Sequence, residues 1–229
     1  MSTTSLPLTQ HRSEQIERYT FKERICHWLT GFSYLYCLLT GLAFYTPYLF
    51  WLALALGGGA TSRYWHPFIG LEFFVAAIWM HRLWRRDVEM TEADREWLDK
   101  SSNYVTNQDN LVPPQNKFNA GQKMYYWAMY YGAFLLLLSG LFMWFPELIP
   151  FSLRWIRPIA VILHECAALI TIGAFIIHVY MSLFTVPGSL TAMLTGYVSR
   201  DWAATHHRLW YDQIMGRSST AARTPAPKG

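Results

Sequence analysis

Charged residues are scarce in this sequence of 229 residues. Asp, Glu, Lys and Arg make up 15% of the chain, whereas hydrophobic residues make up 52%. A soluble domain usually carries about 25% charged residues, so this chain has too little polar surface for an ordinary soluble protein. The formal net charge of +4 is too small to indicate nucleic-acid binding. The scarcity of charge predicts a membrane protein.

Cysteine is scarce as well, which excludes several kinds of site. Cys26, Cys37 and Cys166 form neither a CxxC pair nor an even set, so a disulfide framework and a zinc site are not expected. The CxxCH motif that attaches haem covalently is absent, so any haem is expected to be bound non-covalently. The polar N-terminus lacks the pattern of a signal peptide, and the membrane spans themselves are expected to direct insertion.

Long segments without charge are the strongest positive feature. No Asp, Glu, Lys or Arg occurs between Ile25 and Ser62, and roughly 20 apolar residues suffice to cross a bilayer. Pro47 divides this segment, so we expect an interfacial extension over residues 48–59. The sequence predicts an all-α, integral-membrane four-helix bundle that forms a single domain over residues 1–229. Its expected spans are residues 26–46, 67–83, 124–145 and 156–184.

Basic residues indicate the orientation of the chain. All 19 Lys and Arg except Arg63, Arg154 and Arg157 lie in the N-terminal tail, in or at the edge of the connection 85–123, or in the tail 195–229. Basic residues collect on the cytoplasmic side of membranes. Both termini and the long connection are therefore predicted to be cytoplasmic, with the chain crossing the membrane several times. The polar end of the chain, residues 218–229, is expected to be disordered.

Four histidines lie in or at the ends of the expected spans, where ionisable side chains are costly and usually functional. His27 is expected to open the first span from the cytoplasmic side, and His66 to open the second from the outside. His164 and His178 are 14 residues apart in the fourth span, so they share one helix face about 21 Å apart. The sequence thus predicts two levels, His66 with His164 outside and His27 with His178 inside.

Facing imidazoles at matched depth are what bis-histidine ligation of haem iron requires. We therefore predict two non-covalent b haems, with the two histidine pairs as the axial iron ligands. The alternative is that each histidine only makes a hydrogen bond between helices. His81, near the inner end of the second span, is the substitute ligand for the inner haem. His206 and His207 are expected to be solvated or packed against a partner.

Several short motifs occur in order between about residues 18 and 215. They are Arg24-Ile-Cys-His27-Trp28, His66-Pro67-Phe68-Ile-Gly70, Asn119-Ala-Gly121-Gln122-Lys123-Met124, Leu163-His164, Ile177-His178-Val-Tyr180-Met181, Gly196-Tyr-Val-Ser199-Arg200-Asp-Trp202, His206-His207 and Trp210-Tyr211. Each motif is weak by itself, whereas the ordered set is specific. In this order they resemble the gamma subunit, cytochrome b556, of respiratory formate dehydrogenase, which belongs to the dihaem membrane cytochromes b.

The resemblance implies the same haem pairing and a place in a larger complex. A molybdenum or tungsten catalytic subunit would oxidise formate, an iron–sulfur subunit would pass electrons to the outer haem, and the inner haem would reduce a membrane quinone near the cytoplasmic face. The residues that match the family's quinone pocket are Asn119, Gly121, Gln122 and His178. An ordinary helix cap and turn is the alternative for Asn119 and Gly121. No catalytic residue is expected in this chain, and the oligomeric state of the complex stays open.

Three charged residues near the two haem levels need separate interpretations. Arg24 lies one turn before His27, and it either neutralises the propionates of the inner haem or anchors the chain on the positive side. Glu72 and Glu165 lie within expected spans, toward the outer haem. A bare carboxylate inside a membrane is disfavoured by several kcal/mol. We therefore predict that both carboxylates lie inside the bundle, with at least one neutral or hydrogen-bonded.

Two rival functions stay open on the sequence alone. A cytochrome b subunit of a nickel–iron hydrogenase or of a sulfur-compound reductase would share this architecture, because the substrate chemistry lies in other chains. A haem-free transporter or scaffold would use the histidines for proton relay or packing, and it would lack Soret absorption. The absence of paired interrupted helices favours the haem protein over the transporter.

Overall fold

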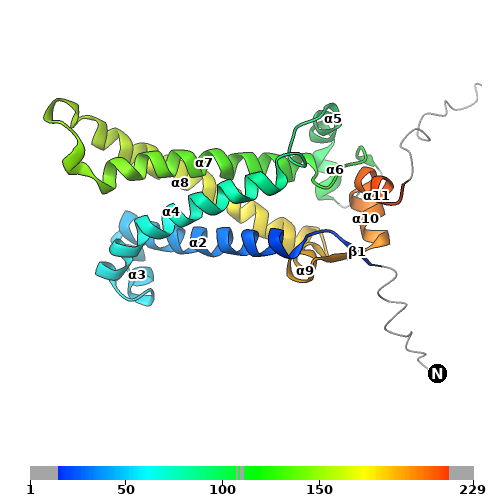
Figure 1. Cartoon of the computed structure of the whole chain (residues 1–229), viewed down its shortest axis with the longest axis horizontal. Coiled ribbons are helices and arrows are strands. Elements are labelled where there is room, and N and C mark those ends of the chain that lie inside the picture. The colour runs from blue at the N-terminus through cyan, green and yellow to red at the C-terminus, as the bar shows by residue number, and fades with distance from the viewer. Residues whose placement is uncertain (1–14, 107, 109–110, 217–229) are drawn as a thin grey trace, which may run out of the picture. The chain divides into compact units, whose positions relative to one another are not determined.

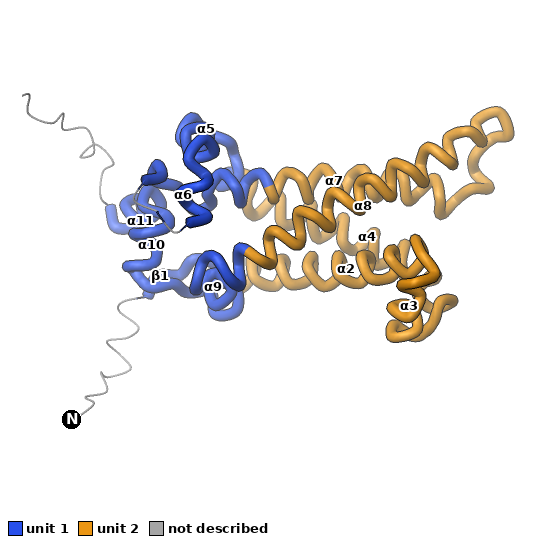
Figure 2. Tube along the Cα trace, turned by 180° about the vertical axis from the view of Figure 1, so that it is seen from behind, with its two compact units in different colours: residues 1–20, 86–124, 181–229 blue, residues 21–85, 125–180 orange. Residues whose placement is uncertain are grey.

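The structure, a computed structural model, describes residues 15–106, 108 and 111–216. The chain is mostly helical and divides into two compact units, coloured separately in Figure 2. Unit 1 draws on residues 1–20, 86–124 and 181–229, and unit 2 on residues 21–85 and 125–180. The segment 218–229, which is expected to be disordered, lies outside the described residues.

Unit 2 is built on long helices, labelled in Figure 1. They are α2 (Phe21–Tyr45), α4 (Gly59–Trp84), most of α7 (Ala120–Trp144) and α8 (Ile156–Tyr180), each of 25 or 26 residues. A 3-10 turn (Pro47–Leu49) and the short α3 (Trp51–Ala55) join α2 to α4, and two 3-10 turns (Pro146–Leu148 and Phe151–Leu153) join α7 to α8. Gly57 and Gly58, with φ of 94° and 97°, end α3 in a conformation that only glycine adopts readily.

Two of these helices begin earlier than the apolar runs do. α2 begins at Phe21 and α4 at Gly59. His27 and His66 therefore lie inside their helices, whereas the sequence had predicted that they open them. The reason is that hydropathy marks the apolar part of a helix, whereas backbone hydrogen bonding continues through polar and aromatic residues to the next breaker. Pro67 is accommodated inside α4.

Within the described residues, three helical segments are long and apolar enough to cross a membrane. They are Phe21–Tyr45, Ala120–Trp144 and Ile156–Thr185, the last including a π-helical turn, Met181–Thr185, that continues α8. α4 is equally long but is not among them, because Arg63, Glu72 and Arg82 dilute its apolar residues. A fourth span therefore stays a prediction.

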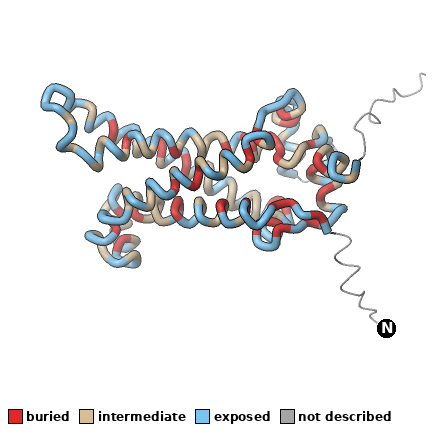
Figure 3. Tube along the Cα trace, in the orientation of Figure 1, coloured by how far each residue is buried: buried red, intermediate tan, exposed pale blue. Residues whose placement is uncertain are grey.

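The core of unit 2 receives side chains from all four long helices. Tyr34 of α2, Phe73 and Ala77 of α4 and Ala133 of α7 are buried together, and Phe175 of α8 packs against them. Much of the remaining surface of these helices is exposed in the isolated chain (Figure 3), and many of its side chains are large and apolar. This pattern, with apolar side chains facing outward, is typical of helices that lie in lipid.

α7 and α8 approach each other closely at Gly132. A Cβ atom at this position would lie 2.6 Å from Cγ2 of Thr171, which is closer than real Cβ contacts allow. Small residues at helix crossings let two backbones approach in this way. Gly132 therefore sets how near α8 lies to α7.

Unit 1 is folded, although its segments are mostly polar in sequence. It contains α5 (Glu92–Asp99), α6 (Ser101–Val105), α9 (Ser189–Thr195), α10 (Arg200–His206) and α11 (Arg208–Ile214). It also contains a two-stranded antiparallel sheet of β1 (Gln15–Glu17) and β2 (Tyr197–Ser199), with Ile16 opposite Val198. This sheet departs from the all-helical prediction and ties the N-terminal segment to the C-terminal tail.

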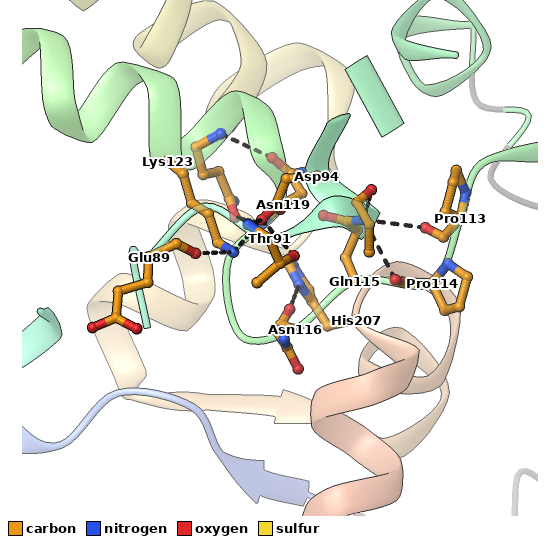
Figure 4. Close-up of polar contacts among 12 residues, drawn as sticks. Glu89, Thr91, Asp94, Pro113, Pro114, Gln115, Asn116, Asn119, Lys123 and His207 are labelled. Carbon is orange, nitrogen blue, oxygen red and sulfur yellow. Dashed lines mark hydrogen bonds and ion pairs between the residues drawn. The ribbon is translucent and has the colours of Figure 1, made fainter. Parts of the chain in front are cut away.

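Unit 1 contains a buried ion pair (Figure 4). Nζ of Lys123 donates to Oδ2 of Asp94 at 2.7 Å and to the carbonyl of Glu89 at 2.9 Å, and both charged side chains are only 2% exposed. The same carboxylate oxygen accepts from the backbone N–H and the hydroxyl of Thr91 at 2.6 and 2.8 Å, which closes a capping box at the start of α5. One carboxylate thus joins α5 to the first turn of α7.

His207 is the second buried polar centre of unit 1, so the expectation that it is solvated is wrong. Its Nδ1–H donates to the carbonyl of Asn116 at 2.6 Å (Figure 4), and its Nε2 accepts from the Arg18 guanidinium at 3.0 Å. Arg18 is itself buried between the rings of Tyr19, Trp202 and Trp210. Burial first, and then the charge of Arg18, hold the pKa of His207 well below its usual value.

We expect Asp94→Ala to lower the free energy of unfolding by about 3–5 kcal/mol, because it leaves the Lys123 ammonium buried and unpaired. Glu92→Ala on the same helix is the matched control, since its ion pair with Arg95 is exposed and such pairs contribute little. Denaturant titration of the purified protein in detergent, read by protease sensitivity of residues 86–124, measures both. Equal effects of the two substitutions would contradict the assignment.

We also expect the protein to lose stability as the pH falls below about 6.5. The unfolded chain binds a proton on His207 near that pH, whereas the folded chain does not because its pKa is lowered. The contribution is therefore complete above pH 6.5 and declines on acidification. His207→Gln should be less stable at pH 8 and should flatten the acid slope of the thermal midpoint. An unchanged slope would show that other groups cause it.

Candidate functional site

The histidines predicted for the inner level face each other in the structure. His27 of α2 and His178 of α8 have ring centroids 6.2 Å apart, and His178 stacks on Tyr125 of α7 with centroids at 4.4 Å and planes 7° apart. Nδ1 of His27 is buried and has no hydrogen-bond partner among the described residues. We call His27 and His178 the inner pair, after their predicted level.

The histidines predicted for the outer level also face each other, and we call them the outer pair. The ring centroids of His66 of α4 and His164 of α8 are 6.4 Å apart. Nδ1 of His66 lies 2.7 Å from the Thr40 hydroxyl, and Nδ1 of His164 lies 3.0 Å from the Ser139 hydroxyl. Both the inner and the outer pair thus bring together histidines that are far apart in the sequence.

The two hydroxyls determine the tautomer of the outer pair. Thr40 donates its proton to the carbonyl of Tyr36 at 2.8 Å, and Ser139 donates its proton to the carbonyl of Leu135 at 2.6 Å. Each hydroxyl has one proton, so its oxygen accepts from the Nδ1–H of the neighbouring imidazole. The Nε2 atoms therefore carry free lone pairs, which is the form in which histidine binds a metal.

Both pairs have the spacing that a metal ion between two imidazoles needs. With each nitrogen about 2 Å from the metal, the ring centroids lie roughly 6 Å apart, as they do in both pairs. Two glycines flank the outer pair: a Cβ at Gly41 would lie 3.7 Å from Cε1 of His66, and one at Gly140 would lie 3.4 Å from Cε1 of His164. Their missing side chains leave room beside the imidazoles, so a planar macrocycle such as haem fits these residues.

Among the described residues, His81 faces aromatic rings and not a second histidine. Its Nδ1 hydrogen-bonds the Tyr126 hydroxyl at 2.7 Å, and its ring stacks on Tyr130 with centroids at 4.5 Å. The aromatic face of α7 therefore accounts for its position, and its role as a substitute ligand stays a prediction.

Asn119 and Gln122 form a reciprocal cap at the start of α7. Oδ1 of Asn119 accepts from the backbone N–H of Gln122 at 2.9 Å, and Oε1 of Gln122 accepts from the backbone N–H of Asn119 at 3.0 Å. Gly121 lies between them, where a Cβ would be 3.4 Å from the Trp97 ring. The helix-cap interpretation is thus observed, while quinone binding by these residues stays a prediction.

The prediction that Glu72 and Glu165 lie inside the bundle is wrong, because both residues are exposed. Glu72 precedes Phe73, and Glu165 follows His164; Phe73 and His164 both face inward. Because successive side chains on a helix are 100° apart, the two glutamates point away from the core. Arg24 is half-buried, one turn before His27 on α2.

The sequence interpretation missed the residues that hold the outer pair. Thr40 and Ser139 are buried. Each is a polar residue within an apolar helix, and this feature can be recognised in the sequence. Gly41 and Gly140, each next to one of these hydroxyl residues, carry no such signal, because glycine is common in membrane helices. Their contact with an imidazole follows only from the packing.

This chain is similar in sequence to a known protein family and to several known proteins. The model of the prokaryotic cytochrome b561 family matches residues 18–196. The cytochrome b556(Fdn) subunit of the nitrate-inducible formate dehydrogenase of Escherichia coli K12 is 34% identical over 203 residues, covering 89% of this chain and 93% of the relative. The cytochrome b556(fdo) subunit of formate dehydrogenase from the same strain is 36% identical over 210 residues, covering 89% and 95%. The cytochrome b556 subunit of formate dehydrogenase from Haemophilus influenzae is 30% identical over 205 residues, covering 89% and 85%.

We expect Thr40→Val and Ser139→Ala to weaken haem binding at the outer pair by about 10- to 100-fold, since they remove the acceptors that orient the imidazoles. Retention of Soret absorption during dilution in detergent measures this. Ser33→Ala is the control, because the buried Ser33 hydroxyl donates to backbone carbonyls of its own helix. Equal retention in all three variants would contradict the role of the hydroxyls.

Proposed function

We propose, because this chain belongs to the prokaryotic cytochrome b561 family, that it is the membrane cytochrome b subunit of a respiratory formate dehydrogenase. In this role it carries electrons from an iron–sulfur subunit through two b haems to a membrane quinone. Formate oxidation belongs to a molybdenum- or tungsten-containing partner, so this chain supplies no catalytic residue. The formate dehydrogenase subunits that it resembles over 89% of its length favour this partner over a hydrogenase or a sulfur-compound reductase.

The observation that carries the proposal is the pair of facing imidazole sites. The centroid distances of 6.2 and 6.4 Å suit one iron at each site, and all four histidines lie within the segment that the family model matches. A transporter or scaffold would not require two pairs of histidines with this spacing. This geometry therefore supports two non-covalent b haems over the haem-free alternative.

Haem b, when bound, supplies reversible one-electron chemistry. The four imidazoles hold and orient it, and the hydroxyls of Thr40 and Ser139 keep the outer imidazoles in the ligating tautomer. The apolar core around Tyr34 and Phe73 excludes water between the two levels, which lowers the local dielectric constant.

All four long helices are proposed to cross the bacterial inner membrane. α4 has 26 residues, so its length of about 39 Å exceeds a hydrocarbon core of about 30 Å. Its packing on α2, α7 and α8 through one core supports a common depth. The distribution of basic residues supports a cytoplasmic position for both termini and the connection 85–123. There Arg24 either contacts the propionates of the inner haem or anchors the chain.

The quinone is proposed to bind near the start of α7 and the inner pair, with Asn119, Gly121, Gln122 and His178 as its contacts. The cap at Asn119 and Gln122 uses their carbonyl oxygens, so it leaves the amide NH₂ groups as donors for quinone oxygens. A ligating histidine keeps one ring nitrogen as a donor as well.

We expect His66→Ala or His164→Ala to remove one haem, and His27→Ala or His178→Ala to remove the other, because each iron loses an axial ligand. The pyridine haemochrome assay should give two haems per chain for the unaltered protein and one for each variant. A single haem in the unaltered protein, or a different pairing among the variants, would reject this assignment and make His81 the next residue to test.

We expect Asn119→Ser and Gln122→Glu to slow reoxidation of the reduced protein by quinone while both haems stay bound. Serine and glutamate preserve a capping box but lack the NH₂ donors. Asn119→Ala is the comparison that loses the cap, at a cost of about 1 kcal/mol. Stopped-flow absorbance measures the rates. If Asn119→Ser and Gln122→Glu reoxidise like the unaltered protein and only Asn119→Ala is impaired, the residues act as a cap and the quinone binds elsewhere.

A further inference from the structure

A cavity of about 480 Å³ opens where α7 ends and α8 begins. Its lining residues are Met143, Arg154, Arg157, Pro158 and Val161. Met143 belongs to α7 and Arg157, Pro158 and Val161 belong to α8, whereas Arg154 directly follows the second 3-10 turn of the connection between them. Figure 1 shows this connection between α7 and α8. Three apolar side chains and two guanidinium groups suit a ligand that is apolar on one side and anionic on the other.

The cavity lies directly beyond the outer pair. Arg157, Val161 and His164 occupy positions i, i+4 and i+7 of α8, so they form one stripe on the same helix face. On α7, Met143 lies one turn beyond Gly140, the residue that abuts the His164 ring. Arg157 is seven residues from His164, a rise of about 10 Å along the helix.

The two arginines have no carboxylate partner in the described part of the chain. Neither forms an ion pair there, and Arg154 instead places its guanidinium 4.8 Å from the centre of the Phe151 ring. Glu147 lies in the same connection and forms no ion pair with either of them. Within the described residues, both guanidinium groups beside the apolar side chains of the cavity are therefore available to bind an anion.

We propose that Arg157, together with Arg154, binds the propionate carboxylates of the haem held by the outer pair. The inference rests on the proposed function, since it requires haem at His66 and His164. Haem b is an apolar ring with two carboxylates at one edge, which matches the apolar and basic halves of the cavity. Guanidinium groups bind carboxylates with two parallel hydrogen bonds. Both arginines are positioning residues, because they act on the haem edge and not on its iron.

This arrangement has a consequence for the redox potential. Iron gains one positive charge on oxidation, so a nearby arginine disfavours the oxidised form. Removing the arginine should therefore shift the potential downward. For a one-electron couple, a tenfold change in the ratio of oxidised to reduced haem equals 59 mV.

The test uses the full chain in detergent and follows the outer haem, identified as the component that His164→Ala removes. Arg157→Gln and the double variant with Arg154→Gln should raise the oxidised-to-reduced ratio at a fixed potential severalfold, toward tenfold in the double variant. Both should also lose the outer haem faster on dilution. Arg157→Lys, which keeps the charge, should restore the potential. Arg82→Gln, in the last turn of α4, is the control and should leave the outer haem unchanged.

Three results would overturn the inference. Unchanged potential and haem retention in Arg157→Gln and in the double variant would exclude propionate binding. The same variants losing a co-purified anionic phospholipid, detected by mass spectrometry, with unaltered haem would assign the cavity to a lipid headgroup. An unaltered protein without Soret absorption would reject the proposed function together with this inference, whereas the first two results leave the proposed function standing.

Discussion

The placement of two histidines on α8 constrains the rest of unit 2. His164 and His178 lie 14 residues apart, close to four full turns, so both imidazoles leave the same face of one helix about 21 Å apart. To ligate the two proposed haems, each imidazole needs a partner from another helix at its own depth. α4 supplies His66 and α2 supplies His27. Because both partners must reach α8, the three helices are held in one arrangement at two separate levels.

The two levels are held by different interactions. In the outer pair, hydroxyls from α2 and α7 accept from the imidazole Nδ1–H groups, so the ring orientation follows from hydrogen bonds. In the inner pair, His178 lies flat on the Tyr125 ring, and Nδ1 of His27 has no partner among the described residues. Hydrogen bonds raise the electron density of a ligating imidazole. The proposed haems would therefore differ in potential, with the difference set by these neighbours.

Unit 1 combines an apolar cluster around Trp97 with buried charge. Lys123 and Asp94 form a fully buried ion pair, and Arg18 is enclosed by three aromatic rings and His207. Buried charges of this kind are costly unless every partner is in place. They make the arrangement of α5, the start of α7 and both terminal segments specific, although none of these segments has a strongly apolar sequence.

Composition and residue spacing are enough to predict the helical class, the membrane character and the four histidines that pair. Each of these depends on composition or on spacing along one helix, such as the 14 residues that separate His164 from His178, and such spacing becomes a distance through helix geometry alone. The folded chain was needed to find the outward position of Glu72 and Glu165, the burial of His207 and the contacts of Gly41 and Gly140 with the outer pair. These features depend on which face of one helix meets which neighbour, and that choice is made by packing between segments distant in the chain.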